Sequence, residues 1–478
     1  MPLKIYNSLT RQKEVFVPVV KGQVRLYTCG VTVYDESHIG HARSAIVFDV
    51  VSRYLRNSGF DVIYARNFTD IDDKIINRAN AENRSWKEIA ETYIASFRSD
   101  MAALGVLPAT YEPRATEHIG EMIDLIEELI QKGFAYRVDG SVYFSVSEYK
   151  DYGALSGRSP DEMLTGTRIE ADERKKDPLD FALWKESKPG EPVWDSPFGH
   201  GRPGWHIECS TMSIKYLGNP FDLHGGGKDL IFPHHENERA QAECATGRRF
   251  VNYWVHNGFV TMDREKMSKS LGNILTIKDF LKTYHPEVLR LFFLSAHYRN
   301  PVDYTDKAVE NADSALHRLY ATLERVSGMK GLENGTPRGN EELEELEKRF
   351  YAAMDDDFNT ALALSSLFDL ATAINRMADE GGGDALPFIL RGRTLLLSLA
   401  NLLGLLVEEA ETFMAEAARR HLAKVGLDEQ RVEEAIRGRA EARRNKDYSR
   451  ADEIRKMLLE KGLTLLDTPD GTKWRIKK

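Results

Sequence analysis

The stretch VRLYTCGVTV at residues 24–33 decides the fold. It is a short apolar run rich in β-branched and aromatic residues, which is typical of a buried β-strand. A helical pattern follows at residues 42–57, a second apolar run at 61–68, and a further helical pattern at 70–104. Strand, helix, strand and helix in this order predict a parallel sheet with right-handed crossovers, and therefore the α/β fold class.

Candidate ligand-binding residues follow the first predicted strand. Ligands of parallel sheets bind beyond the carboxyl ends of the strands, where the run from Cys29 to Thr32 lies. The sequence His38-Ile39-Gly40-His41 then opens the next helix, and helix N-termini attract phosphate through free amide groups and the helix dipole. Two interpretations remain open at this point: a phosphate site, or two surface histidines at a helix cap.

The remaining sequence divides into parts of different character. Residues 113–203 are polar and turn-rich and look like an insertion, with an amphipathic helix at 117–132 and alternation at 135–146. The α/β pattern resumes around 221–223 and 251–260, and the chain beyond residue 270 is helical, with its best helices at 354–378 and 394–407. We therefore expect boundaries that give the segments 1–112, 113–203, 204–270, 271–335, 336–410 and 411–478.

Composition excludes several classes of protein. The 478 residues contain no apolar run of about 18 residues, so we expect no membrane span. No signal-peptide pattern occurs at the start, which favours a cytoplasmic location. Three scattered cysteines argue against a disulfide framework and for thiols or metal ligands. The net charge is -9, yet residues 431–478 hold 14 Lys and Arg against 9 Asp and Glu, so a basic module ends an acidic chain.

A second candidate for phosphate chemistry is Lys266-Met267-Ser268-Lys269-Ser270. Two lysines three residues apart, with small hydroxyl residues, suit a loop that closes on a triphosphate and neutralises charge as pyrophosphate departs. The alternative is an ordinary solvated basic turn.

Metal ligands are suggested by Pro233-His234-His235-Glu236-Asn237-Glu238. The run begins a helix, and His234 and Glu238 lie one turn apart on one face. Cys244 lies too far along this helix to join them, so we assign it to the core. The thiols of Cys29 and Cys209 would complete a set of two cysteines, a histidine and a glutamate, which favours zinc. The alternative is that both thiols are simply buried and His234 is a satisfied polar residue.

Taken together, these motifs resemble a known enzyme family. The histidine and lysine motifs match the two signature sequences of class I aminoacyl-tRNA synthetases, in the same order. The runs at residues 27–35, 67–74, 204–210 and 222–227 are similar to those of cysteinyl-tRNA synthetases. This resemblance implies a Rossmann-like catalytic domain with an insertion, a helical region that contacts the tRNA stem, a helical bundle and a small anticodon-binding domain. It also implies that ATP activates L-cysteine as an adenylate, which then passes to tRNA(Cys).

The resemblance implies roles for particular residues. One zinc ion per subunit would be held by Cys29, Cys209, His234 and Glu238 and would bind the substrate thiolate. The residues expected to surround the amino acid are Gly30, Thr32, Thr69, Trp205 and His224. The residues expected to bind ATP are His38, Gly40, His41 and Lys269, and those expected to act in catalysis are His38, His41, Lys266 and Lys269. Magnesium would accompany ATP, and we expect a monomer.

The basic C-terminal segment favours tRNA as the acceptor. It resembles the anticodon-binding end of the family, and Trp474 could stack on an unpaired base, although it could equally be a core tryptophan. Two rival functions remain. One is a ligase that joins cysteine to an amino sugar, whose members lack this end, and the other is an inactive tRNA-binding protein that kept the fold.

Overall fold

The computed structural model describes residues 2–159, 162–163, 174–266, 274–329, 340–381, 385–468 and 471–476. The chain forms two compact units, each assembled from several segments. The first comprises Met1–Phe280, Phe293–Thr305 and Lys348–Leu364, and the second comprises Leu281–Phe292, Asp306–Glu347 and Ser365–Lys478. Among the described residues, no helix is both long enough and apolar enough to span a membrane.

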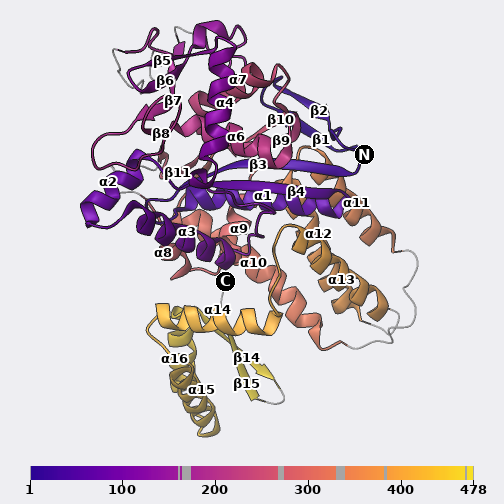
Figure 1. Ribbon diagram of the computed structural model, residues 1–478. Helices are drawn as coiled ribbons and strands as arrows, with labels where there is room; N and C mark the ends of the chain where they lie inside the picture. Colours follow the sequence, from indigo (N-terminus) through magenta and orange to yellow (C-terminus); the bar gives the residue numbers. More distant parts are fainter. Residues whose placement is uncertain are drawn as a thin grey trace. The chain divides into compact units, whose positions relative to one another are not determined.

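A four-stranded parallel sheet forms the centre of the first unit. Its strands are β3 (Gln23–Thr32), β4 (Asp61–Thr69), β9 (Phe221–Gly227) and β10 (Val251–Asn257), in the spatial order β10-β9-β3-β4. The helices α1 (Ile39–Asn57) and α6 (Trp205–Leu217) cover opposite faces (Figure 1). Because both faces are covered, the strands bury apolar residues such as Leu26, Phe68 and Leu223, and polar residues such as His224 are buried with them. The parallel sheet predicted from residues 24–68 is confirmed.

The helical pattern at residues 70–104 forms two helices, so the prediction of one helix was wrong. These are α2 (Asp73–Glu82) and α3 (Trp86–Ala103). Asn83 adopts the left-handed conformation at φ 53° and ends α2. Ser85 and Glu88 then form a reciprocal capping box that starts α3. The capping-box pattern Ser85-x-x-Glu88 was a usable signal of this second helix start, which the interpretation as one helix missed.

The insertion carries its own antiparallel sheet. After α4 (Ile119–Gln131), the strands β5 (Ala135–Val138), β6 (Ser141–Phe144), β7 (Phe181–Glu186) and β8 (Gly201–Pro203) pair in sequence order. Val142, Phe144 and Trp184 are fully buried among these elements. The last strand returns the chain to Gly204, immediately before α6, so the insertion delivers the chain to the central sheet.

Smaller elements complete the first unit. They are the hairpin β1 (Lys4–Asn7) and β2 (Gln12–Val15), the helix α7 (Glu236–Thr246), and a three-stranded sheet of β12 (Glu265–Lys266), β11 (Val260–Met262) and β13 (Val302–Tyr304). The short helix α8 (Ile277–Leu281) follows the lysine motif at residues 266–270, and the next helix, α9 (Pro286–Leu294), lies mostly in the second unit. Phe232 is extended, so the helical turn that continues into α7 begins at Pro233, as expected.

Helices dominate the rest of the chain. They are α10 (Asp306–Ser327), α11 (Glu341–Asp355), α12 (Thr360–Glu380), α13 (Leu386–Leu402), α14 (Ala410–Lys424), α15 (Glu429–Arg444) and α16 (Tyr448–Glu460). The predicted helix at 354–378 was wrong at its start, because Asp357 and Phe358 have positive φ angles and interrupt it. Buried Asp357 accepts hydrogen bonds from the backbone of Tyr6 and the hydroxyl of Tyr298, which fixes this break. The basic tail ends in a hairpin of β14 (Leu463–Thr468) and β15 (Gly471–Ile476), which the sequence did not predict.

A candidate active site with a metal-binding cluster

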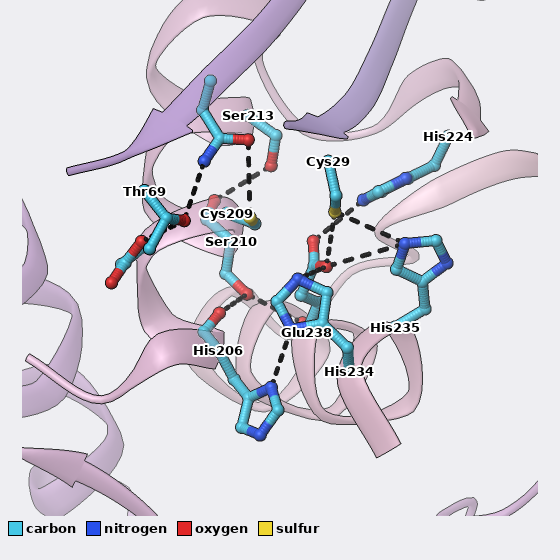
Figure 2. Close-up of polar contacts among 12 residues, drawn as sticks. Cys29, Thr69, His206, Cys209, Ser210, Ser213, His224, His234, His235 and Glu238 are labelled. Carbon is cyan, nitrogen blue, oxygen red and sulfur yellow. Dashed lines mark hydrogen bonds and ion pairs between the residues drawn. The ribbon is translucent and has the colours of Figure 1, made fainter. Parts of the chain in front are cut away.

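The site lies at the carboxyl ends of the parallel strands, where ligands of such sheets bind. Cys29 comes from β3, Thr69 ends β4, and His224 lies on β9. Helices α6 and α7 supply further side chains from above the same edge. Segments separated by up to two hundred residues therefore meet at one place (Figure 2).

Four predicted metal ligands converge here. The donor atoms of Cys29, Cys209, His234 and Glu238 all lie within 4.8 Å of one another. Cys29 Sγ lies 3.0 Å from Glu238 Oε1, and His234 Nε2 lies 2.9 Å from the same oxygen. Figure 2 shows these side chains directed toward a common point. Apart from the half-buried Cys29, the four are buried, so water does not compete strongly for the donors.

A second donor set overlaps the first. Cys29 and Glu238 also lie within 4.8 Å of the ring nitrogens of His224 and His235. His224 Nε2 lies 2.8 Å from Glu238 Oε2, the oxygen that does not face Cys29. His235 Nδ1 is hydrogen-bonded to His256 Nε2 at 2.8 Å. The geometry by itself allows a metal ion in either set.

The electrostatics distinguish the members of the cluster. Burial would raise the pKa of Glu238, but the charges and hydrogen bonds of His224 and His234 hold it well below its usual range. Burial would lower the pKa of His234, yet Glu238 and Cys209 raise it to about 10. Burial also opposes ionisation of Cys209, but a hydrogen bond from Cys29 lowers its pKa to about 6. The cluster thus favours an ionised carboxylate and an ionised thiol at neutral pH.

Partners behind the cluster orient His234. Its Nδ1 is hydrogen-bonded to His206 Nδ1 at 2.8 Å, and its ring stacks on Trp205 with centroids 4.0 Å apart. His234 Nε2 is therefore left to face the cluster, where it lies 2.9 Å from Glu238 Oε1. We did not assign His206 a role from the sequence, although its place beside Trp205 at the start of α6 was a usable signal. His235 and His256 were missed as well, because nothing in the sequence predicts their contact.

The residues predicted to surround the amino acid line the adjoining strand ends. Thr32 pairs with Thr69 at the ends of β3 and β4, and Thr69 Oγ1 donates to Glu208 Oε2 at 2.8 Å. The Gly30 amide donates to Asn67 Oδ1 at 2.8 Å, and a Cβ on Gly30 would lie only 1.5 Å from the Asn67 carbonyl oxygen. Only glycine fits at this position. Asn67 and Glu208, which hold these strand ends in place, were not identified as site residues from the sequence.

The predicted phosphate-binding histidines lie at the start of α1. His38 is the N-cap, and its Nδ1 accepts a hydrogen bond from the Gly40 amide at 3.1 Å. The rings of His38 and His41 stack with centroids 3.8 Å apart, and both are partly exposed. The histidines therefore form one face at a helix N-terminus, where a phosphate is favoured.

Three other expectations concern single residues. Lys266 ends the short strand β12, whereas Lys269 lies outside the described residues. Cys244 is buried in the hydrophobic core of the first unit and belongs to neither donor set, which confirms its assignment. Trp474 is half-buried and packs against the small apolar cluster of the C-terminal segment, formed by residues such as Val432 and Leu458. Its contacts are those of a core residue, and they leave part of the indole accessible.

Comparisons with known proteins agree with this architecture. Residues 15–314 match the family described as "tRNA synthetases class I (C) catalytic domain", and residues 349–407 match the "DALR domain". A methionyl-tRNA synthetase of Mycobacterium tuberculosis, solved in complex with methionyl-adenylate, aligns with a TM-score of 0.60 at 18% identity. That alignment covers 85% of this chain and 94% of the other, and it supports the fold alone.

Curated relatives extend the agreement to the whole sequence. The chain is 53% identical over 485 residues to a protein of Geobacter metallireducens named "Cysteine--tRNA ligase". It is 52% identical over 482 residues to a protein of Geobacter sulfurreducens with the same name, and each alignment covers 100% of both chains. The similarity therefore includes the basic C-terminal segment. The amino-sugar ligases lack this segment, so that rival function is excluded. This chain belongs to the class I cysteinyl-tRNA synthetases, the ligases that use ATP to attach cysteine to tRNA.

Proposed function

We propose that this enzyme selects cysteine with one zinc ion per subunit, held by Cys29, Cys209, His234 and Glu238. The observation that carries the proposal is the convergence of these four donors within 4.8 Å. The donor set fits zinc, because thiolate and imidazole are ligands that this ion accepts readily. His206 bonds Nδ1 of His234, so the buried Nε2 faces Cys209 and Glu238, an orientation that suits a metal ligand.

The second donor set is better explained as support for the first. His224 bonds the Glu238 oxygen that faces away from Cys29, which fixes the carboxylate in the manner of an outer-shell partner. His206 occupies Nδ1 of His234 and so presents Nε2 to the metal. The set with Cys209 also contains two thiols rather than one, and the hydrogen bond from Cys29 lowers the pKa of the Cys209 thiol to about 6. We therefore favour that set.

Selection of cysteine requires more than shape. Serine nearly matches cysteine in size, and a pocket that senses one small group discriminates by about 1–3 kcal/mol. Selectivity on the order of 10⁴-fold needs about 5–6 kcal/mol. Zinc, when bound, would supply a Lewis acid that accepts a thiolate in preference to a hydroxyl. We infer that the insertion has no editing role, since the metal makes a second check unnecessary.

The remaining residues position the amino acid. We propose that Gly30, Thr32, Thr69, Trp205 and His224 surround the substrate. Gly30 keeps β3 close to β4, and the hydrogen bond from Thr69 to Glu208 holds the strand end in place. Trp205 is 38% exposed at the site, so its indole can cover the substrate while stacking on His234. These side chains would orient the substrate carboxylate toward ATP.

ATP is proposed to bind at His38, Gly40 and His41, accompanied by magnesium. A cysteine carboxylate oxygen attacks the α-phosphorus, a new P–O bond forms, and the bond to pyrophosphate breaks. The partly exposed histidine face at the helix N-terminus suits developing negative charge on phosphate oxygens. We assign Lys266 and Lys269 to the stabilisation of departing pyrophosphate, in line with the signature sequence that they form.

The adenylate would then pass to the terminal hydroxyl of tRNA(Cys). We propose that the basic segment 411–478 reads the anticodon, that Trp474 uses its accessible indole edge there, and that residues 336–410 form a separate bundle. In the same proposal, residues 271–335 contact the tRNA stem, segments 1–112 and 204–270 form the catalytic domain, and 113–203 connects them. The enzyme is proposed to act as a cytoplasmic monomer.

Two matched cysteine variants test the zinc assignment. Cys209→Ser is expected to lose bound zinc and the preference for cysteine over serine in ATP–pyrophosphate exchange. Cys244→Ser alters an equally buried thiol outside the cluster and is expected to keep both. Stoichiometric zinc in Cys209→Ser with normal cysteine activation would falsify the ligand assignment. A metal-free wild-type enzyme that still rejects serine would rule out the mechanism.

A further inference from the structure

The backbone at residues 275–277, a few residues after the lysine motif at 266–270, pairs with the backbone at residues 37–39, where the histidine motif begins. The Ile39 amide donates to the Leu275 carbonyl at 3.0 Å, and the Ile277 amide donates to the Ser37 carbonyl at 2.9 Å. Between these bonds, His38 and Thr276 form an antiparallel bridge. The backbone that carries His38 is therefore held by residues 275–277, far away in the sequence.

Lys278 extends this pairing with its side chain. Its Nζ donates to Glu36 Oε2 at 2.6 Å and to Ser96 Oγ at 2.7 Å. Ser96 Oγ also donates to Glu36 Oε2 at 2.6 Å, which closes a triangle of three polar groups. The triangle joins three segments: α8, helix α3, and the loop two residues before His38.

The three hydrogen bonds of this triangle contribute little to the free energy of folding, so we look for another role. The side chains of Lys278 and Glu36 are 45% and 37% exposed, and exposed ion pairs contribute little to the free energy of folding. Partial burial would raise the pKa of Glu36, but hydrogen bonds from Lys278 and Ser96 lower it, so the contact persists as a charged pair. The three hydrogen bonds at this point of the surface therefore restrict the relative positions of the three segments more than they stabilise the fold.

We propose that Lys278 is a positioning residue for adenylate formation, acting through Glu36 and Ser96 on the backbone of Ser37 and His38. Lys278 thus adds a side-chain contact to the backbone bonds that join the segment after the lysine signature to the segment that enters α1. Small displacements of groups that act on the reacting phosphate cost rate steeply, because the transition state needs them in place. This inference rests on the proposed ATP-binding role of His38 and His41.

The test measures steady-state ATP–pyrophosphate exchange by full-length variants. Lys278→Met is expected to lower kcat by about tenfold while the KM for cysteine changes less than about twofold. Lys278→Arg retains a charge and donors and is expected to restore most of kcat. Glu36→Gln is expected to lower kcat as well, and the double variant should be no slower than the slower single variant, because both changes open one triangle.

The matched control is Lys13→Met. Lys13 Nζ lies 2.7 Å from Asp356 Oδ1, and the two side chains are 36% and 49% exposed, so this pair resembles the Lys278 pair without touching the signatures. It is expected to leave kcat unchanged. Normal kcat in Lys278→Met would overturn the inference, as would a loss that Lys278→Arg does not restore. His41→Ala separates the two hypotheses: if it lowers kcat and Lys278→Met does not, only the role of Lys278 fails, whereas normal kcat in His41→Ala contradicts the ATP site.

Discussion

Two carboxylates in different regions of the molecule are each held between two basic side chains. Glu238, in the metal-binding cluster, lies 2.8 Å from His224 and 2.9 Å from His234, and all three side chains are buried. Asp467, in the C-terminal hairpin, lies 2.8 Å from Arg439 and 2.9 Å from Arg443 and is 48% exposed. In both cases the basic partners lower the pKa of the carboxyl group.

The two regions differ in how deeply the carboxylate is buried. We expect the buried Glu238 to serve the metal site and the exposed Asp467 to support the hairpin. A buried ion pair that loses one partner leaves an uncompensated charge, whereas an exposed pair is solvated when it opens. Asp467 ties α15 to the hairpin and can be replaced at little cost. Glu238 belongs to a buried cluster of donor atoms, and a bound cation would balance the negative charge of its carboxylate.

Glu238→Gln should have the most severe consequence. The substitution removes the charge that compensates His224 and His234, at a cost of about 3–5 kcal/mol for a broken buried pair. Bound zinc should fall from about one per subunit to near zero, and cysteine-dependent exchange should fall by about 10³-fold or more. Metal analysis and exchange kinetics measure the two effects. Glu243→Gln, on the same helix but outside both donor sets, serves as the control and should retain zinc.

Removal of residues 431–478 should separate the two steps of the reaction. The deleted segment holds 14 Lys and Arg, so charging of tRNA(Cys) should fall at least tenfold as phosphate contacts are lost. Cysteine-dependent exchange should stay within about twofold of the full chain, because domains of this kind act semi-independently. Loss of exchange from a truncated chain with a normal circular dichroism spectrum would show that the tail supports the catalytic unit instead.

Asp100 provides a third case, a buried carboxyl group whose ionisation is opposed mainly by desolvation. Its Oδ2 finds no hydrogen-bond donor among the described residues, and burial raises its pKa to about 6. Because the folded-state pKa exceeds the unfolded value, the favourable contribution of the protonated form is complete below about pH 4 and is lost as the pH rises through 6. Asp100→Asn should therefore stabilise the protein by about 1–2 kcal/mol at pH 8, after allowance for solvent screening, and have little effect at pH 4. Denaturant unfolding at the two pH values measures this, and an equal effect at both would contradict it.

Asp467→Asn should have the smallest effect. Exposed pairs contribute about 0–1 kcal/mol, so the free energy of unfolding of the C-terminal region should drop by less than about 1 kcal/mol. Exchange should be unchanged. High salt should reduce the difference between the variant and the parent, since exposed charges are screened. A loss comparable to that of Glu238→Gln would mean that burial is not what distinguishes the two regions.

Much of the site could be predicted from the sequence because its chemistry is carried by residue type and local spacing. His234 and Glu238 lie one helical turn apart, and that spacing predicted a shared face, which the 2.9 Å contact confirms. The order of apolar runs predicted the parallel sheet. The breaks near Asn83 and Asp357 do not follow from the apolar pattern, because the segments on both sides of each break are helical; the left-handed conformations of Asn83, Asp357 and Phe358 mark the breaks.

Motifs and local spacing predicted the fold class, the family and the four proposed metal ligands. The packing of the whole molecule determines which of the many histidines meet at Glu238, and it places His206 and His256 behind the residues that face the cluster. It also decided that Lys278 reaches Glu36 across 242 positions. The physical reason is that donor types and helical spacing are local properties, whereas convergence depends on how the whole core packs. Side chains distant in sequence come within bonding distance only when strand register and helix placement are fixed together.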